Sequence, residues 1–269
     1  MTDAAPHTPR KRFGQHFLHE RHVIERILLA LDPRPGERIV EIGPGEGALT
    51  LPLLARHRAL TAIEIDRDLI PRLRAMALGV GDLTIVEADA LTVDLSALAA
   101  GGTLRLVGNL PYNISTPLLF HVLEHAAVVR DMHFMLQKEV VDRMAAGPGS
   151  KVYGRLSVML QARCRVEPLF KVPPGAFRPP PKVDSAVVRL LPLPASEVGV
   201  GDPRAFDAVV RAGFSQRRKT LRNALQPLLD ADAIAATGID PGARAEDIDV
   251  AGWIALARAA ASAVPHGAA

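Results

Sequence analysis

Cysteine is almost absent from this chain of 269 residues, in which Cys164 is the only one. A single cysteine excludes a disulfide within the chain and a zinc site built from several thiolates. Apolar runs of the roughly 18 residues that a membrane-spanning helix needs are missing as well. Residues 1–12 are polar and basic without an apolar core, so no secretory signal is predicted. Together these absences favour a cytoplasmic protein.

The chain does contain enough apolar sequence for a large core, and it has a small excess of positive charge. Hydrophobic residues make up 48% of the 269 residues, which predicts one large domain or a large domain with a small one. A net charge of +3 and a sequence pI of about 9.3 fit a polyanionic partner, but the clustering of cations then matters more than their total. Arginine outnumbers lysine, which suits bidentate phosphate contacts, although a GC-rich genome produces the same bias.

The tetrapeptide Asn109-Leu110-Pro111-Tyr112 follows an apolar run, Leu104 to Val107, that is typical of a buried strand. It has the groups needed to methylate an exocyclic amine such as adenine N6, whose lone pair is delocalised into the ring. The Asn109 side-chain oxygen and the Leu110 carbonyl can accept the amine hydrogens and localise that lone pair in the transition state. Pro111 removes a competing N–H, and Tyr112 offers a face for an extruded base. The alternative is a proline turn at a strand end, with Tyr112 half-buried.

A glycine-rich turn, Gly43-Pro44-Gly45-Glu46-Gly47, follows a strand predicted over residues 38–43. Its glycines let the backbone approach a ligand closely, and a helix predicted from Ala48 points its N-terminus toward the same place. The spacing also satisfies the dinucleotide fingerprint, with Ala48 in third place. The turn therefore does not separate NAD from S-adenosylmethionine, and a purely structural turn is a third interpretation.

Acidic residues follow the next two predicted strands, over residues 60–65 and 83–86. Glu64 can accept hydrogen bonds from both ribose hydroxyls of a cofactor. Asp89 is a candidate acceptor for the adenine amino group of a cofactor, or a helix N-cap. Helical stretches separate these strands, and a further strand is predicted over 132–136, so we expect an α/β fold with βαβ units in a parallel, doubly wound sheet. All the polar strand-end features then lie along one edge of the sheet, where ligands bind.

A proline-rich loop over residues 173–183 lies between two later strands, predicted over 156–166 and 185–191. Its prolines suit polyproline II geometry, which can hold Phe177 as a second stacking face opposite Tyr112. The alternative is a stiff connector with Phe177 in the core.

A segment rich in proline, glycine and small residues, 193–203, predicts a linker between a domain over 1–192 and a helical domain over 204–269. Helices are expected over 204–212, 232–236 and 250–261. A further helix, from Phe214 to Leu225, carries a cluster of cations that no acid interrupts, and this favours nucleic-acid contact over a role in solubility alone. The cluster comprises Arg217, Arg218, Lys219 and Arg222.

The N-terminal residues combine a basic run, Arg10 to Arg12, with the aromatic stretch from Phe13 to Leu18, which suggests a segment that packs over a neighbouring surface. His16, His19 and His22 recur every three residues. No carboxylate or cysteine completes a set of metal ligands, so we expect solvated histidines and no metal site.

Five motifs in order resemble the small-subunit (16S) ribosomal RNA adenine N6,N6-dimethyltransferases, the bacterial kasugamycin-sensitivity methyltransferases. The resemblance runs from about Arg10 to the C-terminal helices, over Phe13–Leu18, Glu41–Gly45, Asn109–Ser115, Phe177–Ser185 and Phe214–Leu225. It implies a Rossmann-like, seven-stranded S-adenosylmethionine-dependent methyltransferase domain whose last strand is antiparallel, followed by a small all-helical domain.

The resemblance also implies a reaction and a set of site residues. The reaction is transfer of methyl groups from S-adenosylmethionine to N6 of two adjacent adenosines near the 3′ end of 16S rRNA in the immature small (30S) ribosomal subunit, by a monomer without a metal. The cofactor would be held by His16, Leu18, Gly43, Gly45, Glu64, Asp89 and Asn109. The target adenine would be held by Asn109, Leu110, Pro111, Tyr112 and Phe177. RNA would be bound by Arg217, Arg218, Lys219 and Arg222.

Three other functions stay open at this point. A dinucleotide oxidoreductase would explain the glycine turn but not the Asn109–Tyr112 stretch or the basic cluster. A large-subunit rRNA adenine N6-methyltransferase and a non-catalytic RNA-binding assembly factor would share the whole fold. The proline-rich loop and the run from Pro148 to Arg155 favour the small-subunit branch.

Overall fold

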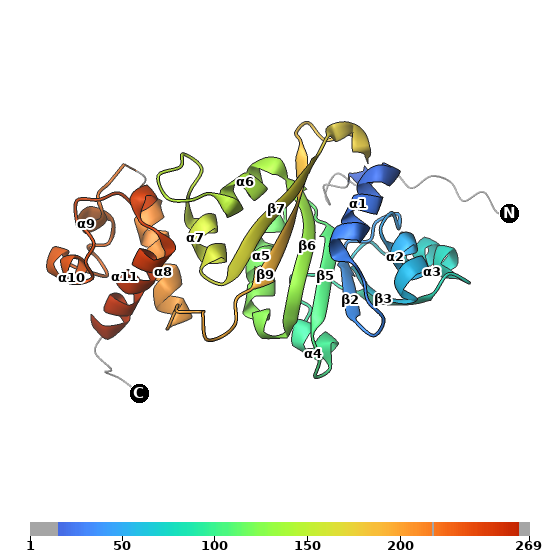
Figure 1. Cartoon of the computed structure of the whole chain (residues 1–269), viewed down its shortest axis with the longest axis horizontal. Helices are drawn as coiled ribbons and strands as arrows, with labels where there is room; N and C mark the ends of the chain where they lie inside the picture. The colour runs from blue at the N-terminus through green and yellow to red at the C-terminus, as the bar shows by residue number, and fades with distance from the viewer. Residues whose placement is uncertain (1–15, 217, 264–269) are drawn as a thin grey trace. The chain divides into compact units, whose positions relative to one another are not determined.

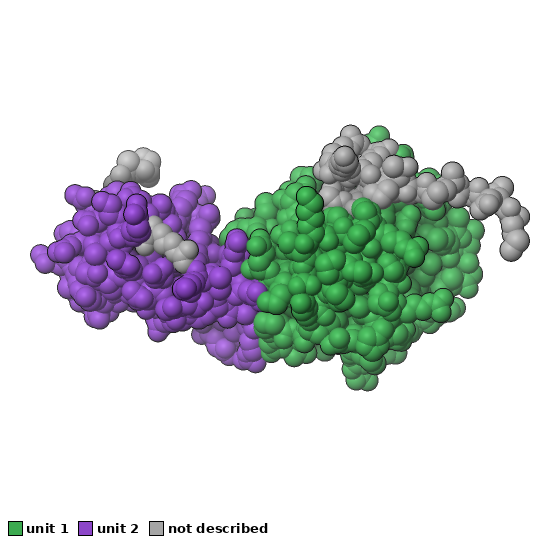
Figure 2. Space-filling model, turned by 90° about the horizontal axis from the view of Figure 1, so that it is seen from above, with its two compact units in different colours: residues 1–141, 167–192 green, residues 142–166, 193–269 purple. Residues whose placement is uncertain are grey.

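The computed structural model of the chain describes residues 16–216 and 218–263. Its contacts divide the chain into two compact units, coloured green and purple in Figure 2. The first unit comprises residues 1–141 and 167–192, and the second comprises 142–166 and 193–269. The basic run Arg10–Arg12, the residues 13–15 and Arg217 lie outside the described residues.

The sequence predicts a domain over 1–192, a linker over 193–203 and a domain over 204–269, and this division stays a prediction. The two compact units do not test it, because compactness does not show which part of the chain folds on its own. The second unit also contains residues 142–166, a segment that the linker-based division kept with the sheet.

The first unit is organised around a seven-stranded sheet with the order β4-β3-β2-β5-β6-β9-β7 (Figure 1). The pairs β4·β3, β3·β2, β2·β5 and β5·β6 are parallel, whereas β9 runs antiparallel to β6. The expected α/β fold, with its antiparallel last strand, is therefore confirmed. The strands are β2 (Arg38–Ile42), β3 (Ala59–Glu64), β4 (Asp82–Glu87), β5 (Leu104–Asn109), β6 (Val129–Gln137), β7 (Cys164–Val172) and β9 (Ser185–Pro192).

The strand β5 is buried along all its length except Asn109, as expected for a parallel strand covered on both faces. Its one charged residue, Arg105, is compensated within the core. Its guanidinium pairs with Asp131 at 2.9 Å and with Glu37 at 2.7 Å, and it donates to the Leu31 carbonyl at the end of α1 at 2.5 Å. A buried charge with these partners avoids the penalty of an unpaired one.

Helices follow the strands of the first unit, as the βαβ pattern predicts. The helix α1, which precedes the first strand of the large sheet, shows how such a helix is specified. Its apolar side chains at Val23, Ile24, Ile27, Leu28 and Leu31 are all buried, and Asp32 ends the helix in a left-handed conformation. The helices are α1 (Arg21–Leu31), α2 (Thr50–His57), α3 (Ile70–Ala77), α4 (Leu95–Ala99), α5 (Ser115–Glu124) and the 3₁₀ turn η2 (Ala126–Val128). The helix α6 (Lys138–Ala145) runs across the boundary between the units.

A second, two-stranded sheet pairs β1 (Phe17–Leu18) antiparallel with β8 (Phe177–Arg178), directly after the 3₁₀ turn η3 (Pro174–Ala176). Phe17 lies opposite Arg178, and Leu18 lies opposite Phe177. This pairing joins the N-terminal segment to the proline-rich loop across most of the first unit's sequence.

The second unit is built around Trp253, which is completely buried. Its ring lies 5.2 Å from that of Phe214, which in turn lies 6.0 Å from Tyr153. A Cβ atom at Gly213 would come within 2.2 Å of the Trp253 ring, so only glycine fits there. The helices are α7 (Arg155–Gln161), α8 (Pro203–Ser215), α9 (Leu221–Ala224), α10 (Ala231–Ala236), η4 (Ala245–Asp247) and α11 (Val250–Ala263).

Two secondary-structure predictions are wrong, and each has a physical reason. The strand predicted over 156–166 is the helix α7 followed by β7, which begins only at Cys164. A short apolar run such as that from Leu156 to Leu160 does not distinguish a buried helix from a buried strand.

The single basic helix predicted from Phe214 to Leu225 is also wrong. The helix α8 ends at Ser215 and α9 begins at Leu221, so Arg218 and Lys219 lie in the turn between them. The backbone N–H groups of Leu221 and Arg222 donate to the carbonyls of Ala243 and Pro241. These donors are therefore used by a neighbouring loop and not by a preceding helical turn.

Among the residues that the structure describes, no helix combines the length and the apolar character required to cross a bilayer.

Candidate active site

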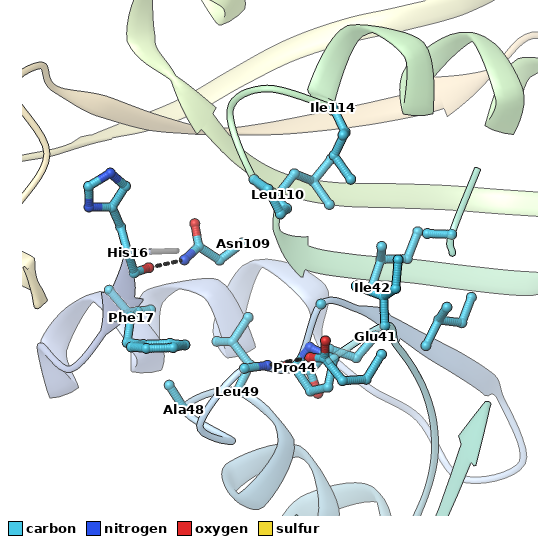
Figure 3. A pocket seen from close by; sticks show the side chains of 18 of the residues that line it. His16, Phe17, Glu41, Ile42, Pro44, Ala48, Leu49, Asn109, Leu110 and Ile114 are labelled. Carbon is cyan, nitrogen blue, oxygen red and sulfur yellow. Dashed lines mark hydrogen bonds between the residues drawn. The ribbon is translucent and has the colours of Figure 1, made fainter. Parts of the chain in front are cut away.

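A cavity opens at the carboxyl ends of β2, β3 and β5 (Figure 3). The predicted cofactor residues His16, Leu18, Gly43, Gly45, Glu64, Asp89 and Asn109 all line it. The predicted base-binding residues Leu110, Pro111 and Tyr112 line it too. Residues from five separate stretches of the chain thus meet at one edge of the sheet, as the strand-end argument predicts.

The glycine turn requires glycine for its backbone geometry. Gly43 and Gly45 have φ angles of 68° and 57°, in the left-handed region that side chains disfavour. A Cβ atom at Gly45 would also lie 3.1 Å from ring atoms of Phe17. The predicted helix follows the turn and begins at Thr50, two residues after Ala48. The backbone of the turn is therefore exposed to the cavity, next to the ring of Phe17 in β1.

Glu64 holds the glycine turn in place through a hydrogen bond to its backbone. Its carboxylate accepts from the Gly45 N–H at 3.2 Å and from the Asp66 N–H at 2.8 Å, and the residue is 5% exposed. Burial raises the pKa of Glu64, while the backbone hydrogen bonds from Asp66 and Gly45 lower it. The carboxylate lies at the cavity with further lone pairs that can accept from a ligand.

Glu41 is a site residue that the sequence argument did not single out. It lines the cavity, is 1% exposed, and accepts a hydrogen bond from the Thr50 hydroxyl at 2.7 Å. Burial raises the pKa of Glu41 to about 8, so the group is mostly protonated at neutral pH. An acid in the middle of the apolar strand over 38–43 was the signal that could have identified it.

Asp89 lines the cavity and accepts a hydrogen bond from the Leu91 N–H at 3.0 Å. It is not the N-cap of a helix, because Asp94 caps α4. The interaction with Leu91 closes a turn and uses one carboxylate oxygen, so a second oxygen is available for a cofactor amino group.

Asn109, the last residue of β5, has its amide orientation set by a hydrogen bond. Its Nδ2 donates to the backbone carbonyl of His16 at 2.8 Å, and Figure 3 shows the amide oxygen pointing away from that carbonyl. The next residue is fixed as well, since the Leu110 N–H donates to Met135 O at 3.1 Å. The strand end therefore presents an oriented acceptor, which is what amine activation requires.

Tyr112 is half-buried, and its hydroxyl forms a 2.7 Å hydrogen bond with the Ser185 hydroxyl of β9. Burial raises the pKa of Tyr112, and the Ser185 hydrogen bond opposes that shift. The Ser115 hydroxyl donates to the Tyr112 carbonyl at 3.1 Å. The hydroxyl and the backbone carbonyl of Tyr112 are thus both hydrogen-bonded, and the ring between them can serve as a fixed stacking face.

Phe177 does not face the cavity in this structure, contrary to its predicted role as a second stacking face. It is 1% exposed and packs in the core cluster with Leu18 and Ala176. Its pairing with Leu18 in the two-stranded sheet holds it there.

The remaining predicted residues lie elsewhere. Arg218, Lys219 and Arg222 are exposed in the second unit.

Over the described ranges, no group of three or more histidine, cysteine or acidic side chains is placed to hold a metal ion.

Known proteins resemble this chain over nearly its whole length. The family described as "Ribosomal RNA adenine dimethylase" matches residues 6–262. Ribosomal RNA small subunit methyltransferase A of Xanthomonas campestris pv. campestris (strain B100) is 64% identical over 248 residues, covering 92% of this chain and 95% of the relative. The protein of the same name from Xanthomonas oryzae pv. oryzae (strain PXO99A) is similar to the same extent, at 64% over 248 residues, with 92% and 95% covered.

Two solved structures share the fold over both units' sequence. A dimethyladenosine transferase from Plasmodium falciparum is 26% identical with a TM-score of 0.79, covering 90% of this chain and 96% of that chain. The 23S rRNA methyltransferase ErmE is 28% identical with a TM-score of 0.70, covering 91% of this chain and 99% of that chain.

Proposed function

This chain belongs to the ribosomal RNA adenine dimethylase family, and we propose that it dimethylates N6 of two adjacent adenosines near the 3′ end of small-subunit (16S) rRNA. It is an enzyme that takes its methyl groups from S-adenosylmethionine. Relatives at 64% identity are named for the small ribosomal subunit, which supports this choice of RNA. We further propose that the protein acts as a monomer, in the cytoplasm, on immature small (30S) subunits.

The observation that carries this proposal is the oriented amide of Asn109 at the edge of the cavity. Its Nδ2 is engaged by the His16 carbonyl, so its oxygen is the group left to accept from a substrate amine. An adenine amino group needs such an acceptor because its lone pair is delocalised into the ring. We propose that the Asn109 oxygen and the Leu110 carbonyl accept the two N6 hydrogens and localise the lone pair on nitrogen.

The cavity residues fit S-adenosylmethionine, which supplies an electrophilic methyl group on a sulfonium sulfur. Glu64 and Asp89 offer carboxylate oxygens for ribose hydroxyls and for an amino group. Gly43 and Gly45 leave main chain accessible, and apolar residues such as Ile65 complete the lining. The main-chain and side-chain atoms of the segment from His16 to Leu18 form another wall.

We propose that Tyr112 holds the extruded adenine by stacking, with Pro111 keeping a competing N–H out of the site. Once the methyl group is on N6, the nitrogen carries an extra proton, which leaves to water. The monomethylated amine keeps one hydrogen for one acceptor. The pocket must therefore accept a methyl group where a hydrogen was, so that a second transfer can follow on the same adenosine.

The second unit is proposed to bind RNA through Arg218, Lys219 and Arg222, together with Arg217. The three described cations are exposed and occupy the turn between α8 and α9 and the start of α9. Lysine and arginine side chains spread over a turn can reach several phosphates of a folded RNA.

Large-subunit rRNA is the alternative substrate, and the similarity to the 23S rRNA methyltransferase ErmE over 91% of this chain favours considering it. Transfer of tritium from labelled cofactor distinguishes the two. We expect label in immature small subunits with the wild type and none with Asn109→Ala. Label only in large-subunit RNA would refute the proposed substrate, and no label in either RNA would refute the proposed activity.

A further inference from the structure

Residues 16–19, called the strap below, are fixed to the proline-rich loop by an unbroken series of contacts. The strand pairing places Phe17 opposite Arg178. It is extended at one end by the His19 N–H, which donates to the Ala176 carbonyl at 3.0 Å. At the other end, His16 Nδ1 lies 2.8 Å from the Pro179 carbonyl. A carbonyl oxygen only accepts, so Nδ1 carries the proton and is the donor.

The strap controls the orientation of the catalytic amide. A side-chain amide has a donor end and an acceptor end of nearly equal size, and only its partners decide which end faces the substrate. At Asn109 the deciding partner is the His16 carbonyl, 2.8 Å from Nδ2. In the reverse orientation two oxygens would face each other, so a docked strap excludes it.

The imidazole of His16 also supports the proposed stacking face. Its ring centroid lies 5.5 Å from that of Tyr112, with 30° between the planes. Tyr112 is held at its other end by Ser185. The side chain of His16 therefore contacts both the loop that anchors the strap and the ring that is proposed to hold adenine.

We propose that His16 is a positioning residue for methyl transfer: its Nδ1–H anchors the strap to Pro179, so that the His16 carbonyl holds Asn109 with its oxygen toward the target N6. This inference rests on the proposed function and assigns His16 a task beyond lining the cofactor cavity. Its consequence is that the strap must be docked before Asn109 is competent. The proline-rich loop acts on catalysis through the strap, without a stacking contact from Phe177.

Three substitutions at one position test this arrangement. His16→Ala removes the donor to Pro179. His16→Asn restores it, because the Asn Nδ2 occupies the same place along the side chain as the His Nδ1. His16→Gln places its amide one bond farther out and serves as the matched control. Two quantities are measured for each: the single-turnover methylation rate of immature small subunits at saturating cofactor, and calorimetric affinity for S-adenosylhomocysteine, which also shows that each variant folds.

We expect the Ala and Gln variants to lose about tenfold or more in rate, since misplacing a reacting group has effects of this size or larger. Because His16 also lines the cofactor cavity, the rates are compared at cofactor concentrations that saturate each variant, so a change in S-adenosylhomocysteine affinity alone does not account for a lost rate. The Asn variant should recover most of the rate. An unchanged rate in His16→Ala would overturn the inference. So would a loss confined to cofactor affinity, or equal losses of rate in all three variants. Failure of the proposed function would look different, as an absence of methyl transfer by the wild type.

Discussion

Replacing Glu41 by glutamine should change the pH dependence of stability in a defined direction. Burial raises the pKa of this carboxyl from 4.5 to about 8 in the folded protein. Between these two values the folded state holds a proton that the unfolded state has released. The free energy of unfolding therefore falls as pH rises through this window, and it levels off above the folded pKa. Glutamine has no proton to release and should remove this slope.

The magnitude follows from the size of the pKa shift. Each pH unit inside the window is worth about 1.4 kcal/mol, so wild type should lose roughly 3 kcal/mol by pH 7 relative to the Gln variant. Glutamine keeps an oxygen that can accept from the Thr50 hydroxyl, now 2.7 Å from Glu41. The site therefore keeps its hydrogen bond while losing its titration.

Urea unfolding of both proteins at several pH values measures this difference. Far-ultraviolet circular dichroism is the suitable probe, because the only tryptophan, Trp253, lies in the second unit. Glu46→Gln removes an exposed carboxylate from the glycine turn that follows the strand of Glu41, and it controls for the loss of a negative charge. The wild-type and Glu41→Gln curves should diverge from about pH 5.5 to 7.5. Parallel curves would mean that Glu41 ionises like a solvated acid, and the account of its burial would be wrong.

Three further predictions concern the site and the RNA. Glu64→Ala should abolish measurable binding of S-adenosylhomocysteine in calorimetry, since lost hydrogen bonds to a charged acceptor are worth about 1.5–3 kcal/mol each; unchanged affinity would mean that the ribose lies elsewhere. Tyr112→Ala should keep that affinity but lower the single-turnover rate at least about tenfold, because stacking is worth about 1–3 kcal/mol per base; a wild-type rate would leave Tyr112 a purely structural role. Changing Arg218, Lys219 and Arg222 to glutamine should flatten the salt dependence of binding to small subunits by roughly two to three units of slope, and coinciding slopes in filter binding would show that these cations are only solvated.

The sheet and the position of the site follow from local sequence. Apolar runs that end in Gly43, Glu64 and Asn109 predict buried parallel strands, and the carboxyl ends of such strands meet at one edge. The structure brings these three residues to one cavity. Local pattern was largely sufficient here because strands buried on both faces are mostly apolar. Arg105 and Glu41 are exceptions within the strands, and each is held by hydrogen bonds in the core.

The contacts that orient the site are not local, and the sequence does not contain them in any readable form. Asn109 and His16 are 93 residues apart, and His16 and Pro179 are 163 apart. The same holds for the turn at Arg218, where a loop near Ala243 takes the backbone donors that a longer helix would have used. Phe177 is buried because its strand pairs with Leu18, which a proline-rich composition does not reveal.

The most direct test of the central claim, that Asn109 and its neighbours dimethylate adenine N6 in small-subunit RNA, is identification of the product. Immature small subunits are incubated with the protein and S-adenosylmethionine, and the RNA is digested to nucleosides for mass spectrometry, with reverse transcription to locate the modified positions. We predict N6,N6-dimethyladenosine at two adjacent positions near the 3′ end, and its absence when Asn109→Ala is used. Dimethyladenosine found only in large-subunit RNA, methylation at an atom other than N6, or unchanged product with Asn109→Ala would contradict the account.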